Sequence, residues 1–275
     1  MAETCYRHPN RETAVSCSSC GRPICPDCMT PTPVGMRCPE CMQQRTKVVR
    51  GVRNSGEGFW RAPATFILIG INVAVYLFEI AGGGGGINSI SESTYVNFSL
   101  HGVAVAEGEW YRLATGGFLH ASITHILFNM VALFFLGRLV EPALGTGRFL
   151  ALYFASLFAG AFGALLLSGA DAYTVGASGA IFGLFSAAFV IARGRGLNAL
   201  AGEIGFILIL NLAFTLSNPD ISIGGHLGGL VAGAICALAI VAGERGRFGS
   251  RHRVAEYAVM ALVAVISVAG ALAVA

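Results

Sequence analysis

The sequence predicts an all-α polytopic membrane protein that is preceded by a small cysteine-rich domain. Apolar residues make up 55% of the 275 residues and charged residues only 12%, whereas soluble domains carry roughly 25% charged residues. The mean hydropathy is +0.67. Seven of the eight cysteines fall within the first 60 residues, where no long apolar run occurs. We therefore expect two domains of different character.

The N-terminal segment does not have the pattern of a signal peptide. Met1 is followed by a polar stretch rich in cysteine and histidine rather than by a basic segment and an apolar run. We expect this segment to stay in the cytoplasm. The chain should divide into a small domain at 1–45, a basic linker at 46–62, a core of six transmembrane helices at 63–245 and a seventh transmembrane helix at 246–275.

Seven apolar stretches are long enough to be considered as membrane spans, since a crossing helix needs about 20 residues. They lie at approximately 63–81, 119–140, 148–168, 178–193, 198–216, 222–243 and 254–274.

The basic residues predict how these spans are oriented. Lys and Arg collect before the first span and in alternate loops after it, and of the 18 Lys and Arg residues only Arg112 falls in a loop on the other side. Cytoplasmic loops carry the excess of Lys and Arg, so the N-terminus is expected in the cytoplasm and the C-terminus outside, with the protein integral to a bacterial plasma membrane. Because the clusters flank apolar segments, they do not indicate nucleic-acid binding.

The loop between the first two spans, 82–118, is unusually long. It begins with five glycines at 82–86 and ends with Trp110, Tyr111 and Arg112. A loop of this length is either functional or flexible, and its aromatic second half is typical of a segment at the membrane interface.

Residues 5–41 contain four ligand pairs, each separated by two residues, a spacing that lets both side chains of a pair reach one tetrahedral zinc ion. Eight ligands complete two closed structural sites: Cys5, His8, Cys17, Cys20, Cys25, Cys28, Cys38 and Cys41. A disulfide framework is the alternative, and a cytoplasmic location disfavours it. The order resembles a B-box-type cross-braced zinc finger, which implies a module that binds a cytoplasmic protein partner. Spacing leaves open whether the pairs alternate or bind sequentially.

Strongly polar residues recur in three of the predicted spans. Such groups are costly at membrane depth and usually face the interior of a bundle. His120, His125 and Asn129 lie in span 119–140, Ser178 opens span 178–193, and His226 lies one turn inside span 222–243. These spans all run inward from the outer face, so the polar residues begin at a similar depth.

Small residues allow the helices that carry Ser178 and His226 to approach closely. Gly179 and Gly183 repeat at four-residue spacing on one, and Gly225, Gly229 and Gly233 on the other. Close packing can bring a serine hydroxyl within hydrogen-bond reach of a histidine, which is the arrangement of an activated nucleophile.

The chemistry that this constellation predicts is acyl transfer. His226 would take the proton of Ser178 during its attack on a carbonyl, and the oxyanion would be bound by the Ser178 backbone N–H and Asn129, with His125 assisting. We expect no carboxylate at the depth of His226, because Asp171 and Asp220 lie in outer loops and Glu203 near the cytoplasmic end. A Ser-His dyad is therefore expected.

Taken together, these sequence motifs resemble those of the rhomboid family of intramembrane serine proteases, and the resemblance covers about residues 60–245. The resemblance rests on 110–112, on His120 followed by His125-Ile126-Leu127-Phe128-Asn129, on Gly176-Ala177-Ser178-Gly179, and on Gly225-His226 with Gly229 and Gly233. It implies a six-helix catalytic core, a Ser-His dyad, an active site without metal and cleavage of transmembrane substrates near their outer ends. We assign Gly176 and His120 to the substrate-binding region.

Three features depart from the best-known bacterial pattern. Phe182 stands four residues after Ser178 where some members have tyrosine, so packing of its ring against His226 could persist without a hydroxyl. The seventh span and the zinc domain are additions to that pattern.

Two other functions compete with that of a protease. One is a non-catalytic rhomboid-like binder or chaperone of membrane proteins, and the other is a transporter or channel with a zinc sensor.

Overall fold

In the computed structural model, the described residues are 3–32, 35–42, 62–81, 86 and 88–275. The chain separates into two compact units, Met1–Phe59 and Trp60–Ala275. The expected basic linker at 46–62 lies outside the described residues except for Ala62, and so do the five basic residues before the first span. Most of the expected glycine run, 82–85, is also outside them.

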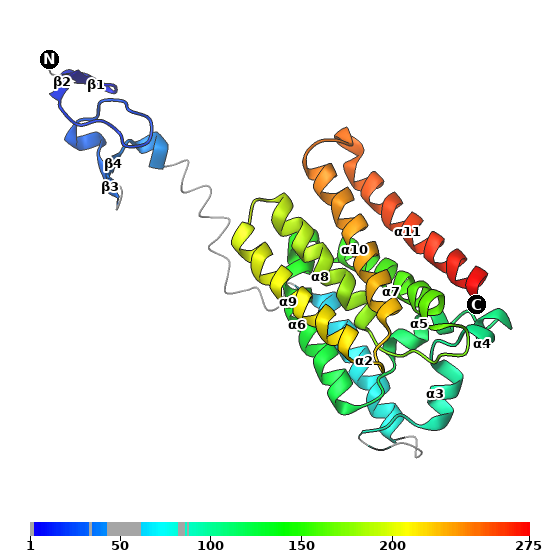
Figure 1. The fold of residues 1–275 in the computed structure, drawn as a ribbon. Coiled ribbons are helices and arrows are strands. Elements are labelled where there is room, and N and C mark those ends of the chain that lie inside the picture. The colour runs from blue at the N-terminus through cyan, green and yellow to red at the C-terminus, as the bar shows by residue number, and fades with distance from the viewer. Residues whose placement is uncertain (1–2, 33–34, 43–61, 82–85, 87) are drawn as a thin grey trace. The chain divides into compact units, whose positions relative to one another are not determined.

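Two small antiparallel hairpins form the N-terminal unit (Figure 1). β1 (Glu3–Cys5) pairs with β2 (His8–Thr13), β3 (Thr30–Thr32) pairs with β4 (Gly35–Arg37), and the 3-10 helix η1 (Pro26–Cys28) precedes β3. The buried apolar side chains of its core are Ile24 and six cysteines. Units below about 40 residues rarely fold without disulfides or metal, so these cysteines are the expected source of its stability.

The second unit is a bundle of apolar helices (Figure 1). Within the described residues, six helices are long and apolar enough to cross a membrane: α2 (Pro63–Ala81), α6 (Ile123–Leu144), α7 (Thr146–Ser168), α9 (Asn198–Ser217), α10 (Ile223–Glu244) and α11 (His252–Val274). A further apolar helix, α8 (Ser178–Gly194), has 17 residues. At 1.5 Å per residue it is about 25 Å long, somewhat less than the ~30 Å hydrocarbon core.

This arrangement confirms the predicted fold class, an all-α polytopic membrane protein with a cysteine-rich N-terminal region. Each of the seven predicted spans corresponds to one helix, and α11 is the helix expected after the six-helix core.

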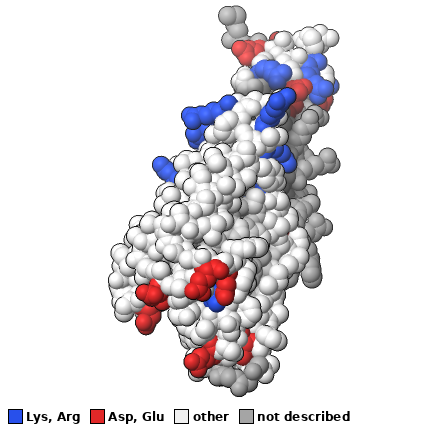
Figure 2. Space-filling view, turned by 90° about the vertical axis from the view of Figure 1, so that its right-hand side faces the viewer, with Lys and Arg blue, Asp and Glu red and all other residues white. Residues whose placement is uncertain are grey.

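Charged residues lie toward the two ends of the helical unit, and a wide uncharged surface lies between them (Figure 2). Arginines follow α6, α8 and α10, where they form ion pairs such as Arg195 with Glu244 at 2.6 Å. Acidic residues of the loops after α2, α7 and α9 gather at the opposite end. The uncharged band has the character of a lipid-facing surface.

The second predicted span was placed four residues too early. α6 begins at Ile123 rather than at 119 because the Ser122 hydroxyl accepts a hydrogen bond from the His125 backbone N–H and caps the helix. It extends to Leu144 and ends at Gly145, whose φ of +84° favours glycine. His120 therefore precedes the helix instead of lying on it, while His125 and Asn129 share its first turns.

Close glycine contacts join the central helices α7, α8 and α10. A Cβ atom added at Gly229 would lie 1.9 Å from the Gly179 carbonyl oxygen, and one at Gly233 would lie 2.1 Å from the Gly183 carbonyl oxygen. On the other side of α10, a Cβ at Gly228 would lie 2.1 Å from the Ala159 carbonyl oxygen. The predicted close approach of the helices that carry Ser178 and His226 is confirmed.

The buried Glu141 side chain fixes α2 against α6. Its carboxylate accepts hydrogen bonds from the backbone N–H groups of Ala64 and Thr65, at 3.0 and 2.9 Å, and from the hydroxyls of Thr65 and Thr146. These are N–H groups at the start of α2, which have no partner within the helix, and the positive end of its dipole favours a carboxylate. Glu141 is thus a cap supplied by another helix.

Short helices fill the long connection between α2 and α6: α3 (Glu92–Phe98), α4 (Gly102–Ala106), α5 (Arg112–Thr115) and the 3-10 helix η3 (Gly116–Phe118). This connection was predicted to be a functional or a flexible loop. From residue 88 onward it is an ordered segment of short helices. The C-terminal end of α11 lies beside α4 (Figure 1) and packs in one apolar cluster with Leu100 and Val105.

Candidate active site and candidate metal centres

Ser178 is the first residue of α8 and is half-buried. The chain reaches it through Gly176, whose φ of +122° is a backbone conformation that glycine readily adopts. The Gly176 N–H donates to the Gly116 carbonyl at 2.9 Å, and Thr174 forms a backbone bridge with Leu100. The α2–α6 connection therefore holds the segment that leads into Ser178.

Arg112 organises that connection from within. Its guanidinium donates to the Val96 carbonyl at 2.7 Å, to the Ser99 carbonyl at 3.0 Å and to the Glu109 carboxylate at 2.6 Å. The hydrogen bonds from Tyr111 and Arg112 hold the pKa of Glu109 below its usual range. Arg112 is the one basic residue that was predicted to lie in an outer loop, and in the structure it cross-links the segments of the α2–α6 connection.

His226 lies in the first turn of α10, and its side chain is only 7% exposed. Its ring stacks on Phe182 with 4.0 Å between the centroids and 19° between the planes, which confirms the packing predicted for Phe182. A Cβ atom at Gly179, the residue after Ser178, would lie 3.3 Å from the carbonyl oxygen of Gly225, the residue before His226. The first turns of α8 and α10 are thus in contact.

No direct hydrogen bond joins Ser178 to His226 in the described structure, and the polar partner of His226 is Thr215. The Thr215 hydroxyl oxygen lies 2.8 Å from Nδ1 of His226. Catalytic hydrogen bonds are often long in enzymes without substrate. Thr215 was not among the residues predicted from the sequence, because a lone threonine in a membrane helix usually bonds to its own backbone.

Two residues of α6 lie on the other side of Gly176. A Cβ atom added at Gly176 would be 2.7 Å from Nε2 of His125 and 3.8 Å from Nδ2 of Asn129. Nδ1 of His125 accepts from the Ala121 backbone N–H at 3.4 Å, which places the ring proton on Nε2. The Asn129 amide donates one hydrogen bond to the His125 carbonyl at 3.1 Å and has a second N–H to offer. Glycine at 176 leaves room for these donors.

His120 is 0% exposed and packs edge-on against His125, with ring centroids 5.0 Å apart. Among the described residues, the one backbone group that faces its ring nitrogens is that of Phe118, without the geometry of a full hydrogen bond. The structure therefore places His120 behind His125 rather than at an open surface.

A buried acidic residue at the active-site end of the bundle was not among the residues predicted from the sequence. Glu79, in the last turn of α2, is 2% exposed, and the one donor that faces its carboxylate is the backbone N–H of His120, without the geometry of a full hydrogen bond in the described structure. It belongs to the same end of the bundle as the start of α6. Glu79 stands close to the end of an apolar run, and the apolar pattern at such a position does not reveal burial.

The comparisons with known proteins agree with this geometry. A Rhomboid domain matches residues 107–243. "Rhomboid protease GluP" of Bacillus subtilis (strain 168) is 36% identical over 192 residues, which cover 68% of this chain and 36% of that protein. "Putative rhomboid protease YdcA" of the same organism is 37% identical over 153 residues, covering 54% of this chain and 76% of that protein. The chain belongs to the rhomboid family.

A more distant rhomboid relative covers a similar region. "Rhomboid protease AarA" of Providencia stuartii is 28% identical over 212 residues, which cover 64% of this chain and 72% of that protein. This chain thus spans about a third of the length of the first relative and about three quarters of the other two. The matched Rhomboid domain contains Ser178, His226, His125 and Asn129, whereas the N-terminal cysteines and α11 lie outside it.

The eight ligands predicted in the N-terminal unit of this rhomboid protein form two clusters. One contains Cys5, His8, Cys25 and Cys28, and the other contains Cys17, Cys20, Cys38 and Cys41, with all ligand atoms of a cluster within 4.8 Å of one another. The first pair thus joins the third and the second joins the fourth. This is the cross-braced arrangement, and it decides between the two pairings that spacing had left open. All eight cysteines of the chain are free.

The dimensions of both clusters suit a tetrahedral metal. A zinc–sulfur bond of about 2.3 Å implies a separation of about 3.8 Å between two sulfur ligands, and Sγ of Cys20 lies 3.8 Å from Sγ of Cys38. Nδ1 of His8 lies 3.3 Å from Sγ of Cys25 and 3.5 Å from Sγ of Cys28. Either cluster can therefore surround one metal ion.

At Cys17, backbone N–H groups favour the thiolate form that a metal requires, whereas burial raises the pKa values of Cys28 and Cys38. Burial raises the pKa of the Cys17 thiol, but hydrogen bonds from the backbone N–H groups of Cys38, Ser19 and Cys20 together lower it to about 6. The Cys38 N–H, for example, donates to Sγ of Cys17 at 3.3 Å. Such N–H···S bonds stabilise metal-bound thiolates as well.

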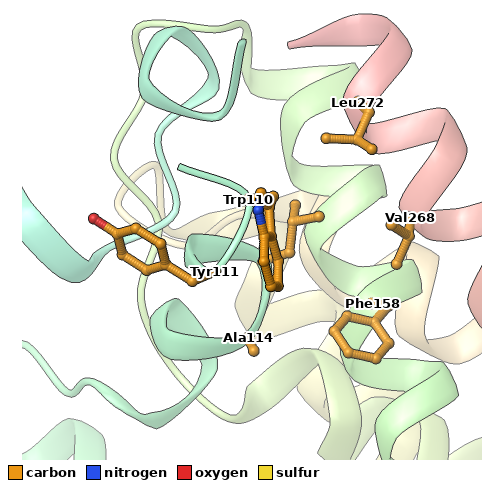
Figure 3. Close-up of a pocket in the computed structure, with 7 residues that line it drawn as sticks. Trp110, Tyr111, Ala114, Phe158, Val268 and Leu272 are labelled. Carbon is orange, nitrogen blue, oxygen red and sulfur yellow. The ribbon is translucent and has the colours of Figure 1, made fainter. Parts of the chain in front are cut away.

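Within the helical unit, an apolar cavity of about 290 Å³ lies between the α2–α6 connection, α7 and α11 (Figure 3). The Trp110 ring lines one side of it, facing Phe158 and Val268, while the Tyr111 hydroxyl points away. None of its lining residues belongs to the Ser178–His226 site.

Proposed function

We propose that this rhomboid protein is an intramembrane serine endopeptidase with Ser178 as the nucleophile and His226 as the general base. The observation that carries the proposal is the contact between the first turns of α8 and α10, which brings Ser178 and the stacked His226 ring to one end of the bundle. The names of the relatives support the same activity.

The reaction follows from the residues at this end. Nε2 of His226 accepts the hydroxyl proton of Ser178 while the serine oxygen attacks the scissile carbonyl carbon. The protonated ring then gives that proton to the leaving amine, and an acyl-enzyme remains. Water enters, loses a proton to His226 and releases the carboxylic acid, and Ser178 regains its proton.

The developing oxyanion would be bound between α8 and α6. The Ser178 backbone N–H is the first of α8 and has no partner within the helix, and the helix dipole adds favourable charge. The second amide N–H of Asn129 and the Nε2–H of His125 are directed toward the space that Gly176 leaves open. Removing one such donor typically slows catalysis by about 10²–10³-fold. His120, which is buried behind His125, would support that ring beside the bound substrate.

The substrates are proposed to be transmembrane proteins that are cut near their outer ends. A peptide bond within an intact membrane helix is shielded because its backbone groups are satisfied internally. The helix α8, at 17 residues, is short for a span, which favours a position of Ser178 below the membrane surface. We therefore expect substrates with Gly, Pro or polar residues that weaken the helix at the cleavage site, and replacing these residues by Leu should abolish cleavage.

The proposed orientation keeps the N-terminus in the cytoplasm and places the C-terminus and the active-site end outside, in a bacterial plasma membrane. The distribution of arginine and acidic residues over the two ends supports it (Figure 2). A periplasmic reporter enzyme fused after Ala275 should be active; a reporter active only when fused at the N-terminus would reverse the topology.

A fluorophosphonate probe tests the nucleophile directly. The purified protein in detergent should be labelled on Ser178, and Ser178→Ala and His226→Ala should each abolish labelling. Ser186→Ala is the matched control, because Ser186 lies two turns further along α8, where its hydroxyl donates to the Gly183 carbonyl, and it should label like the wild type. Equal labelling of all variants would contradict the dyad, and no labelling at all would favour a non-catalytic binder of membrane proteins.

We propose zinc as the metal of both N-terminal clusters, in a purely structural role. Four ligands close each site and leave no open position for chemistry. The domain would then present a rigid surface to a cytoplasmic protein partner. Elemental analysis of the purified chain should find two zinc ions per molecule, and absence of metal in the folded, reduced protein would reject the assignment.

A further inference from the structure

The Thr215 side chain lies against the Nδ1 edge of the His226 ring. Thr215 is in the last turn of α9 and is 2% exposed. Its hydroxyl oxygen takes part in two short contacts, one of 2.8 Å to Nδ1 of His226 and one of 2.8 Å to the Asn211 carbonyl oxygen.

The proton count at this hydroxyl determines the direction of both hydrogen bonds. A carbonyl oxygen can only accept, and a threonine hydroxyl has one proton to give. Threonine in a helix commonly donates that proton to the carbonyl four residues earlier, and Asn211 is that residue. The oxygen of Thr215 then presents a lone pair to His226, so Nδ1 must carry a proton to complete the contact.

We propose that Thr215 is a positioning residue that fixes His226 in the tautomer protonated on Nδ1. The proposal deepens the proposed function, on which its kinetic part rests. A neutral imidazole has one protonated nitrogen and one with a lone pair. With the proton held on Nδ1, the lone pair is on Nε2, which is the nitrogen that must accept the Ser178 proton.

Phe182 and Thr215 constrain different degrees of freedom of the ring. The stacked Phe182 ring, 4.0 Å away, fixes the plane of the imidazole, but an apolar face cannot distinguish one nitrogen from the other. The Thr215 oxygen distinguishes them, because turning the ring over would leave the oxygen facing a carbon. A hydroxyl on α9 thus does for His226 what a carboxylate does in a Ser-His-Asp triad, without a buried charge.

Two substitutions at Thr215 distinguish the effect of losing the hydroxyl from the effect of changing the side-chain volume. Thr215→Val removes the acceptor at nearly constant volume, whereas Thr215→Ser keeps it. For cleavage of a transmembrane substrate, Thr215→Val should lower kcat about 10- to 100-fold with KM unchanged, since a hydrogen bond to a group that becomes charged is lost. Thr215→Ser should retain kcat within about threefold of the wild type.

Ser217 on α9 provides a matched control. Its hydroxyl donates to the carbonyl four residues earlier, that of Ala213, just as Thr215 donates to Asn211, but it is exposed. Ser217→Ala should therefore leave kcat unchanged. A loss of kcat equal to that of Thr215→Val would show that α9 back-bonding, and not the contact to His226, is responsible.

Nitrogen-15 NMR of histidine-labelled protein reads the tautomer without any activity. The measurement is made in a Ser178→Ala background at a pH where the ring is neutral, and the His226 signals are assigned by their loss in His226→Ala. We expect a protonated Nδ1 and an unprotonated Nε2, and a mixture of both forms in Thr215→Val. A proton on Nε2 in the parent protein would overturn the proposal.

The two readouts keep this proposal separate from the proposed function. If the tautomer is as expected but Ser178 is not labelled by the fluorophosphonate probe, the protease assignment fails and the tautomer assignment stands. If Ser178 is labelled and Thr215→Val cleaves as fast as the wild type, the positioning role of Thr215 is wrong and the dyad remains.

Discussion

Gly229 offers the sharpest test of the contact between α8 and α10. A Cβ atom at this position would lie 1.9 Å from the Gly179 carbonyl oxygen, whereas an ordinary Cβ contact is at least 3.4 Å. Gly229→Ala therefore forces the two backbones apart by about 1.5 Å, the difference between these distances. Neither partner can yield by rotating a side chain, because the opposing atoms are backbone.

The expected consequence is a loss of activity larger than the loss of stability. Overpacking a core typically costs about 1–3 kcal/mol. A displacement of about 1 Å at reacting groups can slow catalysis by about 10²-fold, and this displacement lies between the turns that carry Ser178 and His226. We predict that Gly229→Ala lowers the rate of fluorophosphonate labelling by about 100-fold and the thermal midpoint by several degrees.

Gly202→Ala is the control for this experiment. Gly202 lies within α9, and a Cβ atom there would have no heavy atom within 4 Å. Exchange of an unconstrained helical glycine for alanine is neutral or slightly stabilising, so labelling and thermal midpoint should equal those of the wild type. A Gly229→Ala protein with wild-type labelling and stability would refute the inferred contact between α8 and α10.

Three further predictions concern the scaffold and the metal clusters. Glu141→Gln should destabilise the helical unit by about 2–3 kcal/mol, because each carboxylate oxygen accepts two hydrogen bonds and an amide NH₂ would oppose two donors; an unchanged thermal midpoint in detergent would contradict this role. Arg112→Lys should expose residues 92–118 to limited proteolysis, since one ammonium cannot reach all three partners of the guanidinium, and a protection pattern equal to the wild type would argue against the cross-link. Cys25→Ser and Cys20→Ser should each release one of two zinc ions with no change in the labelling of Ser178, whereas loss of both ions from either variant would show that the clusters are not independent.

The sequence predicted the membrane helices well because the requirement is simple. A crossing helix needs a continuous apolar run of sufficient length, and the runs in this chain are separated by glycine, arginine and short polar segments. The position of each helix start was less certain, because it depends on a single cap. Because Ser122 caps α6, the helix begins four residues later than predicted, and His120 lies before it.

The candidate site was predictable as a set of residues but not as a geometry. Serine, histidine and asparagine in apolar spans are uncommon enough to be noticed, and glycine spacing indicated which helices approach. Thr215 was not noticed because threonine bonded to its own helix is common, and only the fold shows that its oxygen also reaches His226. Glu79 was overlooked for a related reason, since burial cannot be read from a position near the end of a span.

For the metal clusters, too, the sequence predicted which residues are ligands but not which of them lie together. The spacing of the ligand pairs predicted two sites, but either pairing was compatible with it. The hairpin of β1 and β2 and the following η1 bring the first and third pairs together. Which ligand pairs share a metal site therefore depends on how the backbone folds, and the spacing within each pair does not determine it.

Cleavage of a transmembrane substrate in proteoliposomes tests the central claim most directly. The purified protein is reconstituted with a single-span substrate that carries a Gly-rich outer segment, and the products are identified by intact mass. The account predicts one cut near the outer end of the span with the wild type and none with Ser178→Ala or His226→Ala. Cleavage that persists in Ser178→Ala, with the same product masses, would contradict it.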